Sequence, residues 1–192
     1  MSVLGIDPGP DSSAWLEWDP ATEQIIACGE EPSLATCERV REAAFRGIRV
    51  AIEAVTCYGA PVGKETYETC YWIGEMRRIC RGAKYEAQIV PYRDISRNLC
   101  RIAGANDTQV YAALKERFGA PGTVKAPGML FPLKGKEHIR SALAVAIYVG
   151  DTQEKTTELS MKMRGNSGAR CPYIYARRHR QAPEWGQNQH PR

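Results

Sequence analysis

One short segment constrains the fold more than any other. Residues 50–55 read Val-Ala-Ile-Glu-Ala-Val, a nearly continuous apolar run that contains a single carboxylate, Glu53. Strands that are covered on both faces of a sheet are apolar in this continuous way, whereas half-exposed strands alternate between apolar and polar residues. We therefore predict a buried central strand here.

The segments on either side predict the rest of the sheet. Three short apolar runs come first, joined by turn signals such as Asp-Pro-Gly, and they are typical of an antiparallel meander. A helix then leads into the central strand, which we expect to lie beside the first strand. The chain is predicted to form a five-stranded mixed α/β sheet with helices on both faces. The expected strands are residues 2–6, 13–18, 24–28, 50–55 and 86–90, and the expected helices are 33–48, 64–81, 95–102, 107–118 and 138–149.

Helix faces and ends follow from apolar spacing and from capping residues. Ser33 is predicted to cap the first helix and Asn106 the fourth, while Gly119 and Gly150 are predicted stops. The expected inward residues are Leu34, Cys37, Val40, Ala44 and Ile48 on the first helix, and Tyr67, Cys70, Ile73 and Cys80 on the second.

Composition predicts one domain and a tail. The chain has 192 residues, of which 43% are hydrophobic and 25% charged, as is usual for one folded domain. No run of 18 apolar residues and no secretion signal is found, so we expect no membrane association. Seven cysteines without a Cys-x-x-Cys pair predict reduced, mostly buried thiols in the cytoplasm. We expect a domain over residues 1–150 and a flexible basic tail over 151–192.

The net charge of +4 lies entirely in the tail. Residues after Gly150 include eight basic and four acidic side chains, which leaves residues 1–150 neutral. Basic residues gather a second time between residues 77 and 101, a pattern that fits a phosphate backbone. A solvated basic face is an equally good interpretation of either cluster taken alone.

Three residues are candidates for chemistry. Asp7 ends the first strand, Glu53 lies within the central strand, and His138 begins the last helix. Neighbouring buried carboxylates cost several kcal/mol unless a partner or a cation compensates them, and their oxygen atoms suit Mg²⁺. The alternative is that Asp7 only caps a turn and Glu53 lies at a strand edge. Small residues at Ala142, Ala144 and Ala146 would let the last helix approach the strands closely.

A possible nucleotide-binding loop is rejected. Residues 59–64 follow a strand and open a helix, but they have three residues between the glycines instead of four, and Glu65 follows Lys64. We therefore expect no nucleotide cofactor.

The motifs together resemble one family. Residues 4–9, 51–55, 73–74, 105–110 and 138–144 occur in the order and spacing of RuvC-type Holliday junction resolvases, and the resemblance covers about residues 1–150. Residues 65–69 and 72–74 look like the bacteriophage-borne branch of this family. The resemblance implies an RNase H-like fold, a homodimer in a bacterial cell, and an endonuclease that nicks four-way DNA junctions symmetrically. It also implies two Mg²⁺ ions per site, with Mn²⁺ as a substitute, and nicks with 5′-phosphate and 3′-hydroxyl ends.

The same resemblance implies roles for particular residues. Asp7 and Glu53 match two catalytic carboxylates, and His138 matches an acidic position at which some members carry histidine. Ser141 stands where the family has a further carboxylate, for which Glu137 is a possible replacement. Two further departures are Thr56 in place of a junction-stacking aromatic residue, with Tyr58 nearest, and Asp107 in place of a lysine. The residues expected to contact DNA are Tyr58, Arg77, Arg78, Arg81, Arg93, Arg97 and Arg101.

Two other functions stay open. The first is an RNase H-fold nuclease that acts on flaps, branched replication intermediates or RNA in hybrids, because Thr56 and Ser141 depart from the junction-cleaving pattern. The second is a junction-binding protein without catalysis. Retention of Asp7, Glu53 and His138 argues against the second, since an unneeded buried charge is unfavourable.

Overall fold

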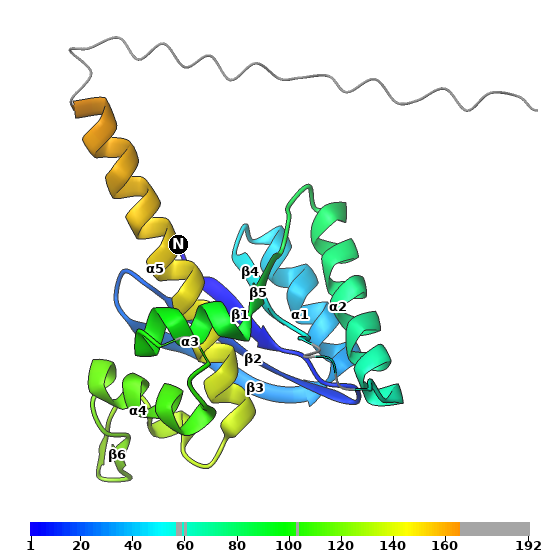
Figure 1. The fold of residues 1–192 in the computed structure, drawn as a ribbon, viewed down its shortest axis with the longest axis horizontal. Coiled ribbons are helices and arrows are strands. Elements are labelled where there is room, and N and C mark those ends of the chain that lie inside the picture. Colours follow the sequence, from blue (N-terminus) through cyan, green and yellow to red (C-terminus); the bar gives the residue numbers. More distant parts are fainter. Residues whose placement is uncertain (57–58, 60, 103, 166–192) are drawn as a thin grey trace, which may run out of the picture.

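A five-stranded mixed sheet forms the centre of the protein (Figure 1). The computed structural model describes residues 1–56, 59, 61–102 and 104–165. The strand order is β3-β2-β1-β4-β5, in which β1, β2 and β3 are antiparallel and β4 and β5 run parallel to β1. This confirms the predicted sheet and the place of the fourth strand beside the first. The strands are β1 (Val3–Asp7), β2 (Ser12–Asp19), β3 (Gln24–Pro32), β4 (Arg49–Ala54) and β5 (Gln88–Pro91).

Helices cover both faces of the sheet, as predicted. The helices α1 and α2 share one apolar core with the sheet, and α3, α4 and α5 share the other (Figure 1). A two-stranded hairpin, β6 (Gly122–Thr123) and β7 (Ala126–Pro127), and a short 3₁₀ helix, η1 (Phe131–Leu133), occupy the expected loop. The α-helices are α1 (Ser33–Phe45), α2 (Lys64–Gly82), α3 (Tyr92–Cys100), α4 (Asp107–Phe118) and α5 (Glu137–Gly165).

Alternation along β1 and β4 decides which face each side chain joins. Ile6 and Ile52 belong to the core under α1 and α2, while Val3 and Ala51 belong to the core under α5. Successive side chains of a strand point to opposite faces. Asp7 and Glu53, one residue after the two isoleucines, therefore lie on the α5 side of the sheet.

Glycine and alanine bring α5 very close to β1. A Cβ atom on Gly5 would lie 2.1 Å from the carbonyl oxygen of Ala142 and 2.9 Å from Cβ of Ala146. The expected close approach of this alanine-rich helix is confirmed, and it fixes the first turn of α5 near the ends of the strands.

The predicted helix stop at Gly150 is wrong. Helix α5 continues to Gly165, so the expected domain boundary at residue 150 falls inside it. A Cβ atom at position 150 would lie 2.5 Å from the Trp18 ring. The glycine is therefore explained by this close contact inside the helix, and not by a helix end. The expected tail beyond Gly165 lies outside the described residues. None of the helices in the described part of the chain is long and apolar enough to span a membrane.

Several predicted inward residues are in fact exposed. Leu34 and Tyr67 are 66% and 67% exposed, and Cys70 is also exposed. Helix α1 instead buries Thr36, Cys37, Val40 and Ala43, and α2 buries Thr69, Met76, Ile79 and Cys80. Cys37, Val40 and Cys80 are buried as predicted. Thr36 and Thr69 are also buried, and each can be so because its hydroxyl group donates to the carbonyl four residues earlier. Ala44 is half-buried, and Ile48 is buried but lies beyond the end of α1.

Two other local predictions also need correction. Ser33 is the first residue of α1, preceded by Pro32, and it makes no cap; its hydroxyl group instead donates to the Gly9 carbonyl. The five cysteines that the structure describes are free thiols, as expected, but only Cys37 and Cys80 are buried. The prediction of mostly buried thiols is therefore wrong for this part of the chain.

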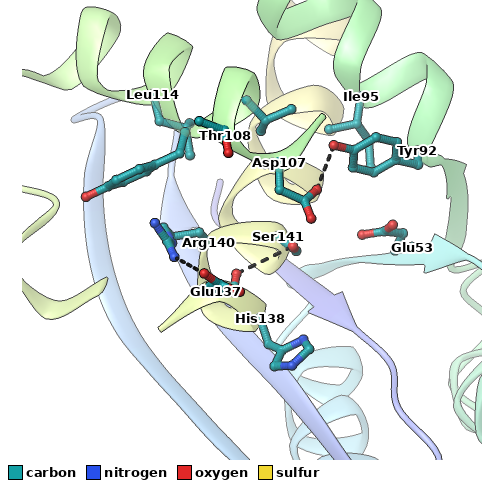
Figure 2. Close-up of a pocket in the computed structure, with 13 residues that line it drawn as sticks. Glu53, Tyr92, Ile95, Asp107, Thr108, Leu114, Glu137, His138, Arg140 and Ser141 are labelled. Atoms are coloured by element: carbon teal, nitrogen blue, oxygen red, sulfur yellow. Dashed lines mark hydrogen bonds and ion pairs between the residues drawn. The ribbon is translucent and has the colours of Figure 1, made fainter. Parts of the chain in front are cut away.

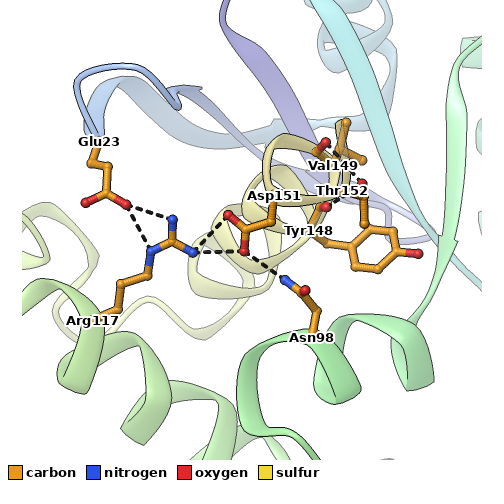
Figure 3. Close-up of polar contacts among 7 residues, drawn as sticks. All are labelled: Glu23, Asn98, Arg117, Tyr148, Val149, Asp151 and Thr152. Atoms are coloured by element: carbon orange, nitrogen blue, oxygen red, sulfur yellow. Dashed lines mark hydrogen bonds and ion pairs between the residues drawn. The ribbon is translucent and has the colours of Figure 1, made fainter. Parts of the chain in front are cut away.

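Arg117 ties α4 to the rest of the molecule (Figure 3). Its guanidinium group donates to Glu23, in the turn between β2 and β3, at 2.7 and 3.1 Å, and to Asp151 on α5 at 2.9 and 3.1 Å. Asn98 of α3 donates to the same aspartate at 2.9 Å. This network holds α3, α4 and α5 together, and so fixes the helix whose first residue is Asp107.

Candidate active site

Parallel pairing of β1 and β4 places two carboxylates side by side. The pairing ends with Ile6 opposite Ile52, so Asp7 and Glu53 follow as neighbours at the same edge of the sheet. Both side chains are largely withdrawn from solvent, since Asp7 has a side-chain exposure of 19% and Glu53 is half-buried. The structure therefore brings together the two acids that the sequence singled out.

His138 completes this group from the other direction. It lies in the first turn of α5, and its Nδ1 atom is 3.1 Å from Oδ2 of Asp7. The imidazole is 70% exposed, which leaves its other edge open to solvent. The approach of α5 to Gly5 creates this contact between residues 131 positions apart.

The electrostatics of the pair favour a bound cation. Burial, followed by the negative charges of Asp7 and Asp107, raises the pKa of Glu53 to about 8. Burial also raises the pKa of Asp7, although the hydrogen bond and charge of His138 act in the opposite direction. Each carboxylate therefore resists ionisation because water is excluded and like charges are near. A divalent cation would relieve both effects.

Asp107 is a site residue that the sequence analysis missed. It is the first residue of α4, and its Oδ1 atom accepts a hydrogen bond of 2.7 Å from the Tyr92 hydroxyl (Figure 2). Burial and the Asp107 carboxylate raise the pKa of Tyr92, so its hydroxyl group stays protonated and remains a donor. Figure 2 shows the Asp107 and Glu53 carboxylates facing the same hollow. The available signal was the acidic residue at a position where the family pattern has lysine.

The hollow lies between α3, α4 and the start of α5. It has a volume of about 340 Å³, and Glu53, Asp107, His138 and Ser141 are among the residues that line it. A second hollow of about 250 Å³ is lined by Asp7, Glu53 and Tyr92 among others, so Glu53 belongs to both. The two hollows share Glu53 and Tyr92, and we call them together the acidic groove because Asp7, Glu53 and Asp107 line them.

The expected substitute for the missing carboxylate does not face the other acids. Glu137 is 86% exposed and forms an ion pair with Arg140 at 3.4 Å. The Ser141 hydroxyl group donates to the Glu137 carbonyl at 3.5 Å. Asp107 thus lies in a better position than Glu137 to replace the carboxylate that Ser141 does not supply.

The donor atoms fit a hard divalent cation, although they are not yet gathered around one point. Carboxylate oxygens and one imidazole are suitable ligands for Mg²⁺ or Mn²⁺. In the described part of the chain, no group of three or more His, Cys, Asp or Glu side chains is placed to hold a metal ion. Coordination by this set therefore requires the side chains to turn toward one another.

Most of the arginines predicted to contact DNA are paired with carboxylates. Arg77 and Arg81 both bind Glu86, and Arg78 binds Glu75, all on the α1 and α2 side of the sheet. Their helix covers the face opposite to the one on which Asp7 and Glu53 lie.

The remaining candidates lie elsewhere. Arg97 binds Asp94 on α3, whereas Arg93 and Arg101 form no ion pair with another described residue. Thr56 is exposed and donates to the Ala54 carbonyl at 3.3 Å, and Tyr58 is outside the described residues. The DNA contacts of these residues stay a prediction.

Comparisons with known proteins agree with the fold. No protein-family model matches the sequence, and no curated protein matches it. The structure of Thermus thermophilus RuvC is similar over 81% of this chain and 98% of that chain, with a TM-score of 0.58 and 17% identity. The structure of T. thermophilus RuvC in complex with a Holliday junction substrate covers 77% of this chain and 92% of that chain, with a TM-score of 0.54 and 16% identity. The chain therefore has the RNase H-like fold seen in RuvC, as the sequence predicted.

Proposed function

We propose that this protein is a metal-dependent nuclease that resolves four-way DNA junctions by paired, symmetric nicks. One observation carries the proposal: Asp7 and Glu53 lie side by side at the carboxyl ends of two parallel strands, and His138 contacts Asp7, on a fold shared with RuvC. A solved RuvC structure is a complex with a Holliday junction substrate, which supports branched DNA as the substrate class.

Asp7, Glu53, His138 and Asp107 are the residues that would hold the metal. Divalent ions bound there supply the positive charge that lowers the pKa of an attacking water and stabilises the leaving 3′ oxygen. The chain's own contribution is to orient the ligands: His138 fixes one oxygen of Asp7, and the Tyr92 hydroxyl fixes one oxygen of Asp107. Water attacks phosphorus as the bond to the 3′ oxygen breaks, which leaves a 5′ phosphate and a 3′ hydroxyl.

Paired nicks require two such sites. A homodimer places two copies on opposite strands of a four-way junction, and the two-fold symmetry of the dimer matches that of the substrate. The molar mass of the protein in solution, measured by light scattering with and without a junction, tests this part of the proposal. A monomer in the presence of the junction would contradict it.

The test of the activity is a substrate panel. A labelled synthetic four-way junction, a linear duplex, a flap and an RNA/DNA hybrid are each incubated with the protein in Mg²⁺, in Mn²⁺ and in EDTA. We expect metal-dependent, paired nicks in the junction and little cleavage of the linear duplex. Preferred cleavage of the flap or hybrid would instead establish the wider RNase H-fold nuclease, and junction binding without cleavage in either metal would establish a non-catalytic binding protein.

A further inference from the structure

Two cations are held against one tyrosine at the wall of the acidic groove. The guanidinium carbon of Arg140 lies 4.1 Å from the centroid of the Tyr111 ring, and Lys115 Nζ lies 5.0 Å from the same centroid. Arg140 comes from α5, two residues after His138, whereas Tyr111 and Lys115 come from α4. The aromatic ring stabilises both cations and keeps the planar guanidinium in one orientation.

The positive charge of this group is only weakly neutralised. Within the described residues, Glu137 is the one carboxylate that forms an ion pair with Arg140 or Lys115. The Glu137 side chain is 86% exposed, whereas the Arg140 side chain is only 17% exposed. An exposed carboxylate gains little from such a pair, so an incoming anion replaces it easily. Of the two cations, Arg140 is the one among the described residues that lines the hollow, together with Tyr111.

Two of these three residues lie beside the carboxylates of the acidic groove. Arg140 lines the same hollow as Glu53, Asp107 and His138 (Figure 2). Tyr111 lines it as well. An acidic groove repels a phosphate backbone unless fixed positive charge adjoins it. The arginines of α2 cannot play this part, because they lie on the other face of the sheet and are paired with carboxylates.

We propose that Arg140, Lys115 and Tyr111 form a phosphate-binding site that holds the DNA backbone next to the carboxylates of the groove. This inference rests on the proposed function and adds a positioning site to it. The guanidinium fork binds a phosphate oxygen pair, which is the geometry that arginine favours, and Lys115 adds a second charge. A bound phosphate replaces Glu137 as the ion-pair partner of Arg140.

The test measures junction binding at several salt concentrations in EDTA, where no cleavage interferes. Log affinity falls as log salt concentration rises, and each phosphate contact adds about 0.9 to the steepness of this fall. We call this steepness the slope, so a lost contact lowers it. We expect Arg140→Gln to lower this slope by about one and to weaken binding about tenfold at moderate salt. Arg140→Lys keeps the charge, so it should restore the slope while recovering only part of the affinity.

Arg41→Gln is the matched control. Arg41 on α1 also forms an ion pair with a glutamate three residues earlier, Glu38, but it lies on the opposite face of the sheet. Its replacement should leave the slope unchanged. Replacing Arg140, which is largely buried, could also disturb folding. Lys115 is exposed, so Lys115→Gln is a second variant that should fold normally, and it too should lower the slope.

The outcomes separate the two proposals. Slopes equal to wild type in both Arg140→Gln and Lys115→Gln, with wild-type binding of the junction intact, would overturn the phosphate site and leave the nuclease proposal standing. A slope lowered as much in Arg41→Gln as in Arg140→Gln would also overturn it. Failure of the wild-type protein to bind any branched DNA would overturn the proposed function itself.

Discussion

Glu53→Gln measures how much the charge of this buried carboxylate lowers the free energy of unfolding when no metal is bound. Glutamine has nearly the same shape but carries no charge. The folded pKa of about 8 lies well above the value of about 4.5 of an exposed glutamate. Between these two values the folded state retains a proton that the unfolded state has lost, so the free energy of unfolding falls as pH rises. In metal-free buffer, this loss is complete only above pH 8.

The magnitude follows from the same shift. Each unit of pKa difference corresponds to about 1.4 kcal/mol, so the charge of Glu53 destabilises the metal-free protein by about 2 to 5 kcal/mol above pH 8. Urea unfolding in EDTA at pH 5 and pH 9 measures it. We expect Glu53→Gln to be close to wild type at pH 5 and clearly more stable at pH 9.

Two comparisons make this measurement decisive. Glu116→Gln, at an exposed position on α4, should leave the free energy of unfolding unchanged at both pH 5 and pH 9. Millimolar Mg²⁺ should stabilise the wild type at pH 9 and Glu53→Gln much less, because a ligand that binds only the folded state stabilises it. A Glu53→Gln protein that is no more stable than wild type at pH 9 would refute the account of an uncompensated carboxylate.

Three further predictions concern other parts of the structure. Asp107→Asn should weaken Mn²⁺ binding, followed by electron paramagnetic resonance, roughly tenfold or more, and Ser141→Asp on that background should restore it; unchanged binding in Asp107→Asn would contradict the assigned role. Arg117→Ala should lower the free energy of unfolding by about 2 to 3 kcal/mol in urea, because Glu23 and Asp151 lose the cation that they share. Arg97→Ala, which breaks an exposed pair, should cost less than about 0.5 kcal/mol. Gly150→Ala should lower the free energy of unfolding by about 1 to 3 kcal/mol, because the new Cβ meets the Trp18 ring. Gly74→Ala, with open space around it on α2, should raise the free energy of unfolding by about 0.5 to 1 kcal/mol. Equal effects of the two substitutions would show that the Trp18 ring does not exclude a side chain at position 150.

Strand periodicity allowed the core of this fold to be predicted from the sequence. The apolar run around Glu53 and the order of the strands were enough to place β4 beside β1, and with it Glu53 beside Asp7. Helix faces were less predictable. Leu34 and Tyr67 have apolar character and helical spacing, yet Thr36 and Thr69 are buried in their place. Packing between layers decides such cases, and it depends on partners that are distant in the sequence.

The helix stop predicted at Gly150 was wrong, and Asp107 was not recognised as a site residue, for a related reason. Gly150 has the position of a helix stop, but its role is set by Trp18, more than 130 residues away in the sequence. Asp107 has the position of a helix-capping acid, and Asn106 does form the predicted cap. Only the fold reveals that the Asp107 carboxylate also faces Glu53 and is held by Tyr92.

Asp7 is the residue on which the proposed metal-dependent cleavage of branched DNA depends most directly. Asp7→Asn keeps the size of the side chain and removes its charge, so it should leave junction binding in EDTA intact or tighter, because a repulsion toward phosphate is lost. The direct measurement is the single-turnover rate of cleavage of a labelled four-way junction in Mg²⁺ by wild type and by Asp7→Asn at saturating protein. We expect paired nicks by the wild type and no detectable cleavage by Asp7→Asn. Undiminished cleavage by Asp7→Asn would contradict a catalytic role of Asp7.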